Sequence, residues 1–106
     1  MVCVSVFYPN DPGKKFDHDY YAASHMPMVM DRLKSSGMVR YEIDRGVGGG
    51  APGAPAPFVC VGRLYFNTTE GFQDGLTAHG PEILADVPKY TDISPQIQLS
   101  ETAASS

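Results

Sequence analysis

The chain has 106 residues, of which 42% are hydrophobic and 19% charged, a size and mixture typical of one compact globular domain and too small for a two-domain enzyme. The net charge is −4 and the basic residues are scattered, which argues against nucleic acid as a partner. The 2 cysteines, Cys3 and Cys60, suggest neither a disulfide framework nor a zinc site, because they are far apart and lack metal-ligand spacing.

The first predicted element is a strand over residues 2–8, because β-branched and aromatic residues run up to a turn rich in Pro, Asn and Gly. This run is too short to cross a membrane and lacks a cationic flank, so neither a signal peptide nor an anchor is expected, and a cytoplasmic protein is the default interpretation. A helix should follow over residues 17–34, with Asp17 as its cap and Gly37 just past its end. Pro27 lies inside this pattern and predicts a kink or break.

The middle of the chain predicts two strands joined by a long loop. Apolar and polar residues alternate from Met38 to Arg45, which is typical of an edge strand with one wet face. Residues 46–57 are too rich in Gly and Pro for a helix or a sheet interior. No helix follows these glycines, so no dinucleotide cofactor is expected. Residues 58–66 are again mostly apolar and aromatic and predict a third strand.

A second helix is predicted to begin at Asn67, which has capping-box spacing to Glu70, and to end at Gly80-Pro81. A short turn over residues 82–87 should follow, and the alternation in residues 96–100 predicts a fourth strand. The order β, α, β, β, α, β predicts an α+β, ferredoxin-like fold, with one antiparallel sheet and two helices on one of its faces.

The same pattern predicts an assembly of two copies. A single domain over residues 1–100 is expected, with residues 101–106 as a flexible C-terminal tail. Two helices cover only one sheet face, yet residues 2–8 and 58–66 carry apolar side chains on both faces. An uncovered apolar face would be a large exposed patch, so the simplest cover is a second copy, sheet against sheet, in a two-fold homodimer.

Three segments of the sequence resemble the EthD family, which is associated with bacterial degradation of ethyl tert-butyl ether. They run from Phe16 to Met28, from Asp44 to Pro57 and from Ile83 to Pro95, and the likeness extends from Val2 to about Ser100. The resemblance implies a dimeric α/β barrel, in which two ferredoxin-like sheets pack face to face. It also implies an association with a cytochrome P450 oxidoreductase system. Relatives of this fold include isomerases, cyclases and cofactor-free monooxygenases, so the fold leaves the reaction open.

His25 is the candidate catalytic residue. It lies just before Pro27, and Tyr21 is one turn earlier on the same helix face. An imidazole can take a proton at neutral pH without a cofactor, which suits isomerisation, cyclisation or deprotonation of an activated substrate. The alternative is a helix-end histidine that bonds a nearby carbonyl and has no chemical role.

The candidate substrate-binding residues are Tyr21, Tyr41, Tyr65 and His79. Tyr21 could orient the imidazole of His25 or donate to a developing oxyanion. Tyr41 and Tyr65 could line a pocket for a hydrophobic or aromatic compound, or could fill the core or a dimer interface instead. His79 either lines the same cavity or caps the carbonyls at the end of the second helix.

Two functions are compatible with these residues. The first is a small dimeric protein that binds a hydrophobic small molecule and assists an oxidative pathway of ether or xenobiotic degradation, with an oxygenase system as a partner. The second is a cofactor-independent isomerase, cyclase, lyase or monooxygenase that uses His25 as general base. Neither function calls for a cofactor or a metal ion, and neither nucleic acid nor a membrane is expected as a partner.

Overall fold

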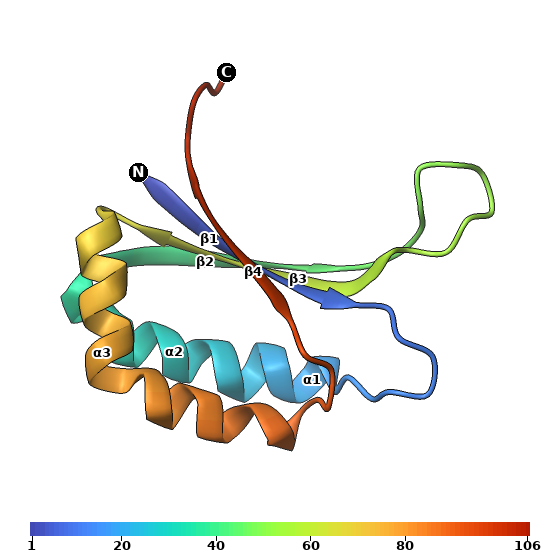
Figure 1. The fold of residues 1–106 in the computed structure, drawn as a ribbon, viewed down its shortest axis with the longest axis horizontal. Helices are drawn as coiled ribbons and strands as arrows, with labels where there is room; N and C mark the ends of the chain where they lie inside the picture. The colour runs from blue at the N-terminus through green and yellow to red at the C-terminus, as the bar shows by residue number, and fades with distance from the viewer.

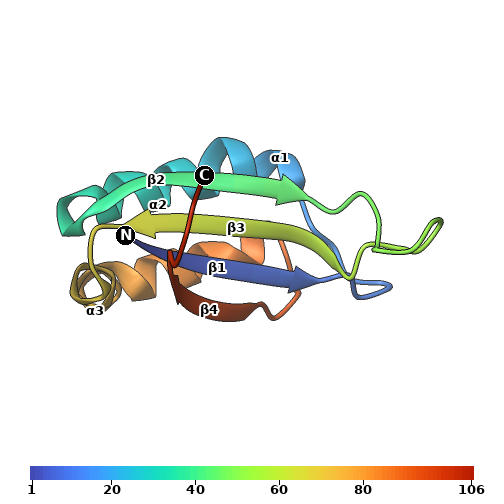
Figure 2. The ribbon, with the colours of Figure 1, turned by 90° about the horizontal axis from the view of Figure 1, so that it is seen from above.

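Four strands form one antiparallel sheet in the computed structural model, which describes all residues from 1 to 106 (Figures 1 and 2). The sheet order is β2-β3-β1-β4, so β2 and β4 are its edges. The strands are β1 (Val2–Pro9), β2 (Met38–Arg45), β3 (Phe58–Phe66) and β4 (Gln96–Glu101). This topology confirms the predicted ferredoxin-like fold and the edge position of the strand that begins at Met38.

The helices cover one face of this sheet, and the other face is left open (Figure 1). The first helical segment comprises α1 (His18–Tyr20), a π-helical turn (Tyr21–His25), α2 (Met26–Leu33) and a 3-10 turn (Lys34–Ser36). The second comprises α3 (Thr69–Asp86) and a 3-10 turn (Val87–Lys89). None of these helices combines the length and the apolar character that crossing a membrane requires.

Of the kink or break predicted at Pro27, the structure shows no break, and the first helical segment instead has an irregular turn before the proline. The turn before the proline widens, so that the backbone N–H of Met26 bonds to the carbonyl of Tyr21, five residues earlier. We attribute this to the proline ring, which would crowd the carbonyl of Ala23 in a regular α-helix and has room in the wider turn. The predicted cap is confirmed, because Oδ1 of Asp17 accepts a hydrogen bond from the N–H of Tyr20 at 3.0 Å.

The second helix differs from the sequence prediction at both ends, since it begins later and extends further. Its cap is Thr68, whose hydroxyl accepts from the N–H of Gly71 at 3.0 Å, and not Asn67. The helix also continues through Gly80 and Pro81 to Asp86, so the predicted short turn over residues 82–87 is wrong. In this last part Ile83 packs against the core and Asp86 bonds to His25, and these contacts offset the cost of an interior proline, which is about 3 kcal/mol.

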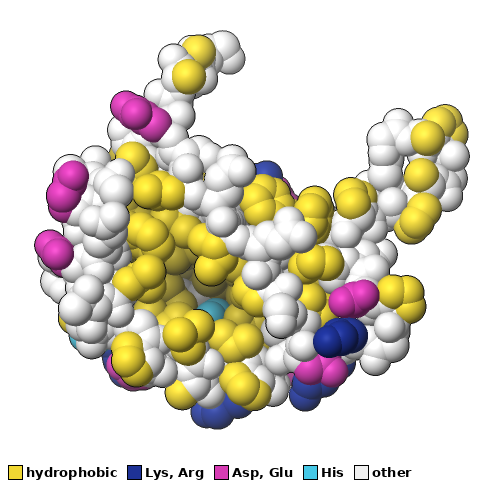
Figure 3. Space-filling model, in the orientation of Figure 1, with side chains coloured by type: hydrophobic (Ala, Val, Ile, Leu, Met, Phe, Trp, Pro, Cys, Tyr) yellow, Lys and Arg dark blue, Asp and Glu magenta, His cyan; other side chains and the backbone are white.

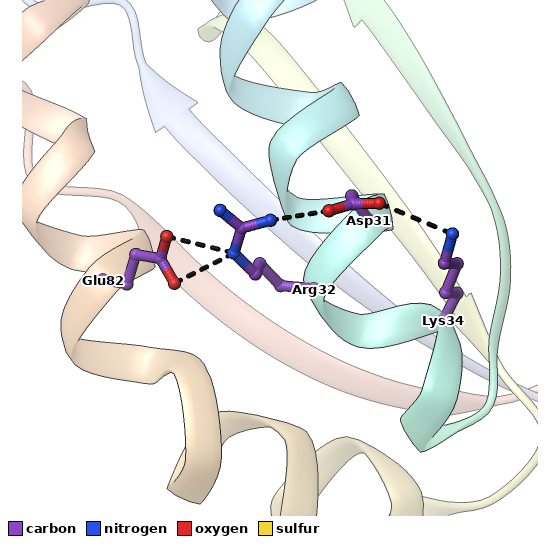
Figure 4. A network of polar contacts seen from close by, with 4 residues as sticks. All are labelled: Asp31, Arg32, Lys34 and Glu82. Carbon is purple, nitrogen blue, oxygen red and sulfur yellow. Dashed lines mark hydrogen bonds and ion pairs between the residues drawn. The ribbon is translucent and has the colours of Figure 1, made fainter.

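The two long helices are joined at the surface by an ion-pair network (Figure 4). Nε of Arg32 on α2 donates to both carboxylate oxygens of Glu82 on α3, at 3.1 and 3.0 Å. Asp31 pairs with Arg32 at 2.6 Å and with Lys34 at 3.4 Å. The network links α2 to the part of α3 beyond Pro81.

The hydrophobic core lies between the helices and the sheet. Its buried apolar side chains come from the first helical segment, from β1, β2 and β3 and from the segment before β4; the largest of those fully buried include Tyr21, Met26, Leu33, Phe66 and Tyr90. The strand register places Val4 opposite Leu64 on the core side, and Cys3 opposite Tyr65 on the open side.

The open face of the sheet is less apolar than the strand pattern predicted. Phe7 and Phe58 form an aromatic pair there, with ring centroids 5.1 Å apart. Next to them, however, lies a polar network in which Arg40 and Tyr65 both contact Glu42, and Arg63 pairs with Asp44. Pairing between neighbouring strands lets these charged side chains cover part of the face.

The loop over residues 46–57 and the end of the chain both project on the open side of the sheet (Figure 1). Hydrogen bonds within the loop, such as Gly49 N–H to the carbonyl of Ala54 at 2.9 Å, give it a defined path. β4 includes Glu101, so the regular structure ends one residue later than the sequence indicated.

Candidate functional site

A cavity of about 420 Å³ lies between α2, α3 and the helix-covered face of the sheet. Figure 3 shows the hollow from the side of Figure 1, ringed by hydrophobic side chains, with a histidine visible inside it. Of its 19 lining residues, 15 are hydrophobic, and His25 is the one histidine among them. Apart from His25 no lining side chain can carry a positive charge. The cavity therefore has the character of a site for an apolar molecule.

The π-helical turn brings Tyr21 and His25 to the cavity. Both side chains are buried, with His25 only 4% exposed. The imidazole stacks on the ring of Tyr21 at a tilt of 16° and lies 4.6 Å from the ring of Tyr90, and the two tyrosine rings are 5.0 Å apart. Packing against these two aromatic rings restricts the orientation of the imidazole plane.

Asp86 at the end of α3 is the polar partner of His25. Oδ2 of Asp86 lies 2.9 Å from Nδ1 of the imidazole, and Oδ1 accepts a hydrogen bond from the hydroxyl of Tyr20 at 2.8 Å. The ammonium group of Lys89 lies 3.4 Å from the same Oδ1. Burial by itself would raise the pKa of Asp86, but the hydrogen bonds from His25, Tyr20 and Lys89 outweigh it, and the pKa of this carboxyl is lowered.

His25 is therefore neutral at pH 7 and holds one particular tautomer. Burial lowers its pKa below the ordinary value, and the neighbouring carboxylate of Asp86 opposes this only in part. An ionised carboxylate only accepts hydrogen bonds, so Nδ1 carries the proton and donates it. Nε2 is then left with a free lone pair, and it has no hydrogen-bond partner among the protein's side chains. Because Nε2 is not fully buried and His25 lines the cavity, a ligand in the cavity can donate a hydrogen bond to this lone pair.

The tyrosines around the histidine contact one another. The hydroxyls of Tyr8 and Tyr90 share a hydrogen bond of 2.8 Å. The hydroxyl of Tyr21 lies directly over Gly62 of β3, where any side chain would collide with it. Burial raises the pKa values of Tyr21 and Tyr90, so both stay protonated. These groups shape the wall and do not supply a charge.

The structure brings together two of the predicted site residues and separates the others. His25 and Tyr21 line the cavity, whereas Tyr41, Tyr65 and His79 are not among its lining residues. Tyr41 packs against the core from β2. Tyr65 lies on the open side of the sheet, where its hydroxyl donates to Glu42 at 2.8 Å and Arg40 lies over its ring.

The residue that sequence reasoning missed is Asp86. The sequence predicts a short turn around Asp86, because Gly80-Pro81 is typical of a helix end. No sequence pattern therefore relates Asp86 to a histidine 61 positions earlier. Tyr20 and Tyr90 were missed for the same reason, since their roles depend on contacts between distant segments. The one sequence signal for Asp86 is the helical spacing of the residues beyond Pro81, which would extend the predicted helix to this residue. No group of three or more His, Cys, Asp or Glu side chains has the geometry of a metal site.

Comparisons with known proteins agree on the fold and on the family. The EthD domain family matches residues 13–94. The crystal structure of an EthD-like protein from Ralstonia eutropha JMP134 is 42% identical, with a TM-score of 0.92, over 97% of this chain and 92% of that one. No match was found among curated proteins.

Two more distant structures share the fold. An ethyl tert-butyl ether degradation (EthD) family protein from Bacillus halodurans C-125 is 17% identical, with a TM-score of 0.63, over 96% of this chain and 98% of that one. A dimeric ferredoxin-like protein from an uncultured marine organism is 13% identical, with a TM-score of 0.61, over 99% of this chain and 97% of that one.

Proposed function

The chain belongs to the EthD domain family, and from that premise we propose that it binds a hydrophobic small molecule in the cavity between α2, α3 and the sheet. The observation that carries the proposal is the cavity itself, whose walls are almost entirely apolar and whose volume of about 420 Å³ lies in the range of small-molecule sites. A soluble domain gains nothing in stability from a hollow of this size, because unfilled space forfeits packing contacts.

Blocking the cavity tests this proposal. Ile97 on β4 lines the cavity and is 63% exposed, so we expect the fold to tolerate a Trp at this position and the larger side chain to occupy part of the cavity. Leu99 lies two residues further along the same strand, is 40% exposed and does not line the cavity. In a titration with naphthalene, Ile97→Trp should weaken binding at least about tenfold, and Leu99→Trp should leave it within about twofold. Equal affinities in all three proteins would contradict the proposal.

We also propose that the protein assists an oxidative pathway of ether or xenobiotic degradation, as a partner of a P450-type oxygenase system. The support is the family membership, together with a cavity that could hold an apolar substrate. Added to such a system, the protein should raise product formation or its coupling to electron supply. The Ile97→Trp variant should fail to do so, and an oxygenase that works identically without the protein would overturn the role.

A second candidate function is cofactor-independent proton transfer with His25 as general base, favoured by the hydrogen bond between Nδ1 of His25 and Asp86. This bond leaves Nε2 as the proton-accepting atom, and a positioned base of this kind contributes a factor of about 10² to 10⁴. The test is exchange of the methyl hydrogens of acetylnaphthalene in D₂O, followed by NMR. Wild-type protein should accelerate it and His25→Phe should not; exchange at the buffer rate with both would rule this candidate out.

We propose, finally, that the working unit is a homodimer in which the open sheet faces of two copies meet. The support is the aromatic pair of Phe7 and Phe58 on a face that no helix covers. The charged side chains beside this pair already neutralise one another within one copy, so they could be covered without leaving an unpaired charge.

A further inference from the structure

Resting on the proposed binding function, we propose that the ligand is a neutral, largely apolar molecule that carries one hydrogen-bond donor, a hydroxyl or an N–H group, and places it on Nε2 of His25. This class of ligand follows from the direction of a single hydrogen bond, between His25 and Asp86, and from the absence of Lys and Arg from the cavity lining.

The imidazole presents an acceptor to the cavity, not a donor. Its Nδ1 is 2.9 Å from a carboxylate oxygen of Asp86, and an ionised carboxylate requires the proton of the pair to sit on Nδ1. Tyr20 and Lys89 hold the same carboxylate from the other side and keep it in place. Nε2 consequently offers only a lone pair, and a ligand group meets it favourably when it brings a proton of its own.

The other polar groups near the cavity do not compete for that donor. The hydroxyls of Tyr8 and Tyr90 bond to each other at 2.8 Å, and the hydroxyl of Tyr21 is confined over Gly62. A ligand without a donor would leave Nε2 in an apolar pocket with no partner, which costs free energy. The free nitrogen therefore selects for a donor and fixes the orientation of the bound molecule.

An anionic ligand is disfavoured by the same surroundings. No Lys or Arg lines the cavity. Lys89, a cation beside the site, is already paired with Asp86. A carboxylate or phosphate in the cavity would lose its hydration, gain no counter-charge and lie close to the ionised Asp86.

The experiment compares four probes with one ring system in the wild-type protein at pH 8: naphthalene, β-naphthol, β-methoxynaphthalene and β-naphthoate. Calorimetric titration should give β-naphthol an affinity roughly five- to tenfold higher than naphthalene and β-methoxynaphthalene, the gain expected of one hydrogen bond. β-Naphthoate should bind at least about tenfold more weakly than naphthalene. His25→Phe should lose the preference for β-naphthol, so that β-naphthol and naphthalene bind this variant within about twofold of each other.

A measurement on the wild-type protein keeps the test independent of that variant's folding. The ¹⁵N chemical shift of Nε2 of His25 should move on addition of β-naphthol and stay in place with β-methoxynaphthalene. If naphthalene binds and β-naphthol binds no better, the donor proposal is overturned while the binding function stands. Tightest binding of β-naphthoate also overturns it. If no probe binds, the binding function fails, and the donor proposal fails with it.

Discussion

At the scale of single residues, the pair of His25 and Asp86 makes the stability of the fold depend on pH. The folded-state pKa of each group is lower than its ordinary value. The unfolded chain therefore binds more protons than the folded chain at acidic pH, and folding stability falls as the pH is lowered. For His25 this contribution is fully present above its unfolded pKa of about 6.5 and is lost as the pH falls through the lowered folded value.

We expect the free energy of unfolding of the wild-type protein to decrease between pH 7 and pH 5, as measured by urea unfolding monitored by circular dichroism. The groups that face His25 are Asp86 and the rings of Tyr21 and Tyr90, and the tyrosines do not titrate in this range. His25→Phe should make the decrease smaller, and part of it should remain because burial also lowers the pKa of His18. A variant with the same slope as the wild type would show that His25 is protonated equally well in the folded and unfolded chain.

Gly62 is the residue on which the position of Tyr21 depends. The hydroxyl of Tyr21 occupies the space that a Cβ atom at position 62 would need, and Tyr21 is 1% exposed and cannot swing away. Gly62→Ala should therefore destabilise the fold by about 1 to 3 kcal/mol, the usual cost of overpacking. Gly50→Ala is the matched control, because nothing lies near a Cβ at that position. Equal melting temperatures of the two variants would contradict this account.

At the scale of elements, both helical segments contain a proline, and the fold accommodates the two prolines differently. A widened π-helical turn precedes Pro27, whereas α3 keeps Pro81 in its interior. The first solution directs Tyr21 and His25 into the cavity. The second extends α3 to Asp86, where the helix supplies the partner of the histidine. Both prolines therefore depart from regular α-helix formation, and both departures position residues of the candidate site.

Replacing the second proline tests what it costs. Pro81→Ala restores a backbone N–H that can bond to the carbonyl four residues earlier and removes the ring that crowds it. We expect the free energy of unfolding to rise by about 1 kcal/mol, seen as a higher melting temperature, because helix packing has absorbed part of the original cost. The hydrogen bond between His25 and Asp86 should survive. A lower melting temperature would mean that the proline itself is needed to pack the cavity wall.

At the scale of the whole molecule, the homodimer that we propose would form through the open sheet face. If two copies meet there, light scattering at micromolar concentration should give the mass of two chains. Phe7→Asp puts a charge next to Phe58 on that face and should yield a folded monomer. Ala78→Asp on the exposed side of α3 adds the same charge elsewhere and should leave the dimer intact. A wild-type protein with the mass of one chain would refute the assembly.

Patterns in the sequence are sufficient to predict the order of elements, the edge strand from Met38, the cap at Asp17 and the placement of Tyr21 and His25 on one helix face. These features depend on residue periodicity and on neighbours a few positions apart, which a linear pattern records. The glycine- and proline-rich loop over residues 46–57 is legible for the same reason, because these residues exclude regular structure wherever they cluster.

The chemistry of the site depends on contacts that form only in the tertiary structure. Asp86 reaches His25 because α3 continues past Pro81, where contacts with the core and with His25 offset the local cost of the proline. Tyr41 and Tyr65 lie outside the cavity lining in the folded chain, although their residue types suit a binding site. The tautomer of His25, and with it the kind of ligand the cavity should accept, is set by one contact between segments 61 residues apart. Contacts over such separations leave no periodic trace in the sequence.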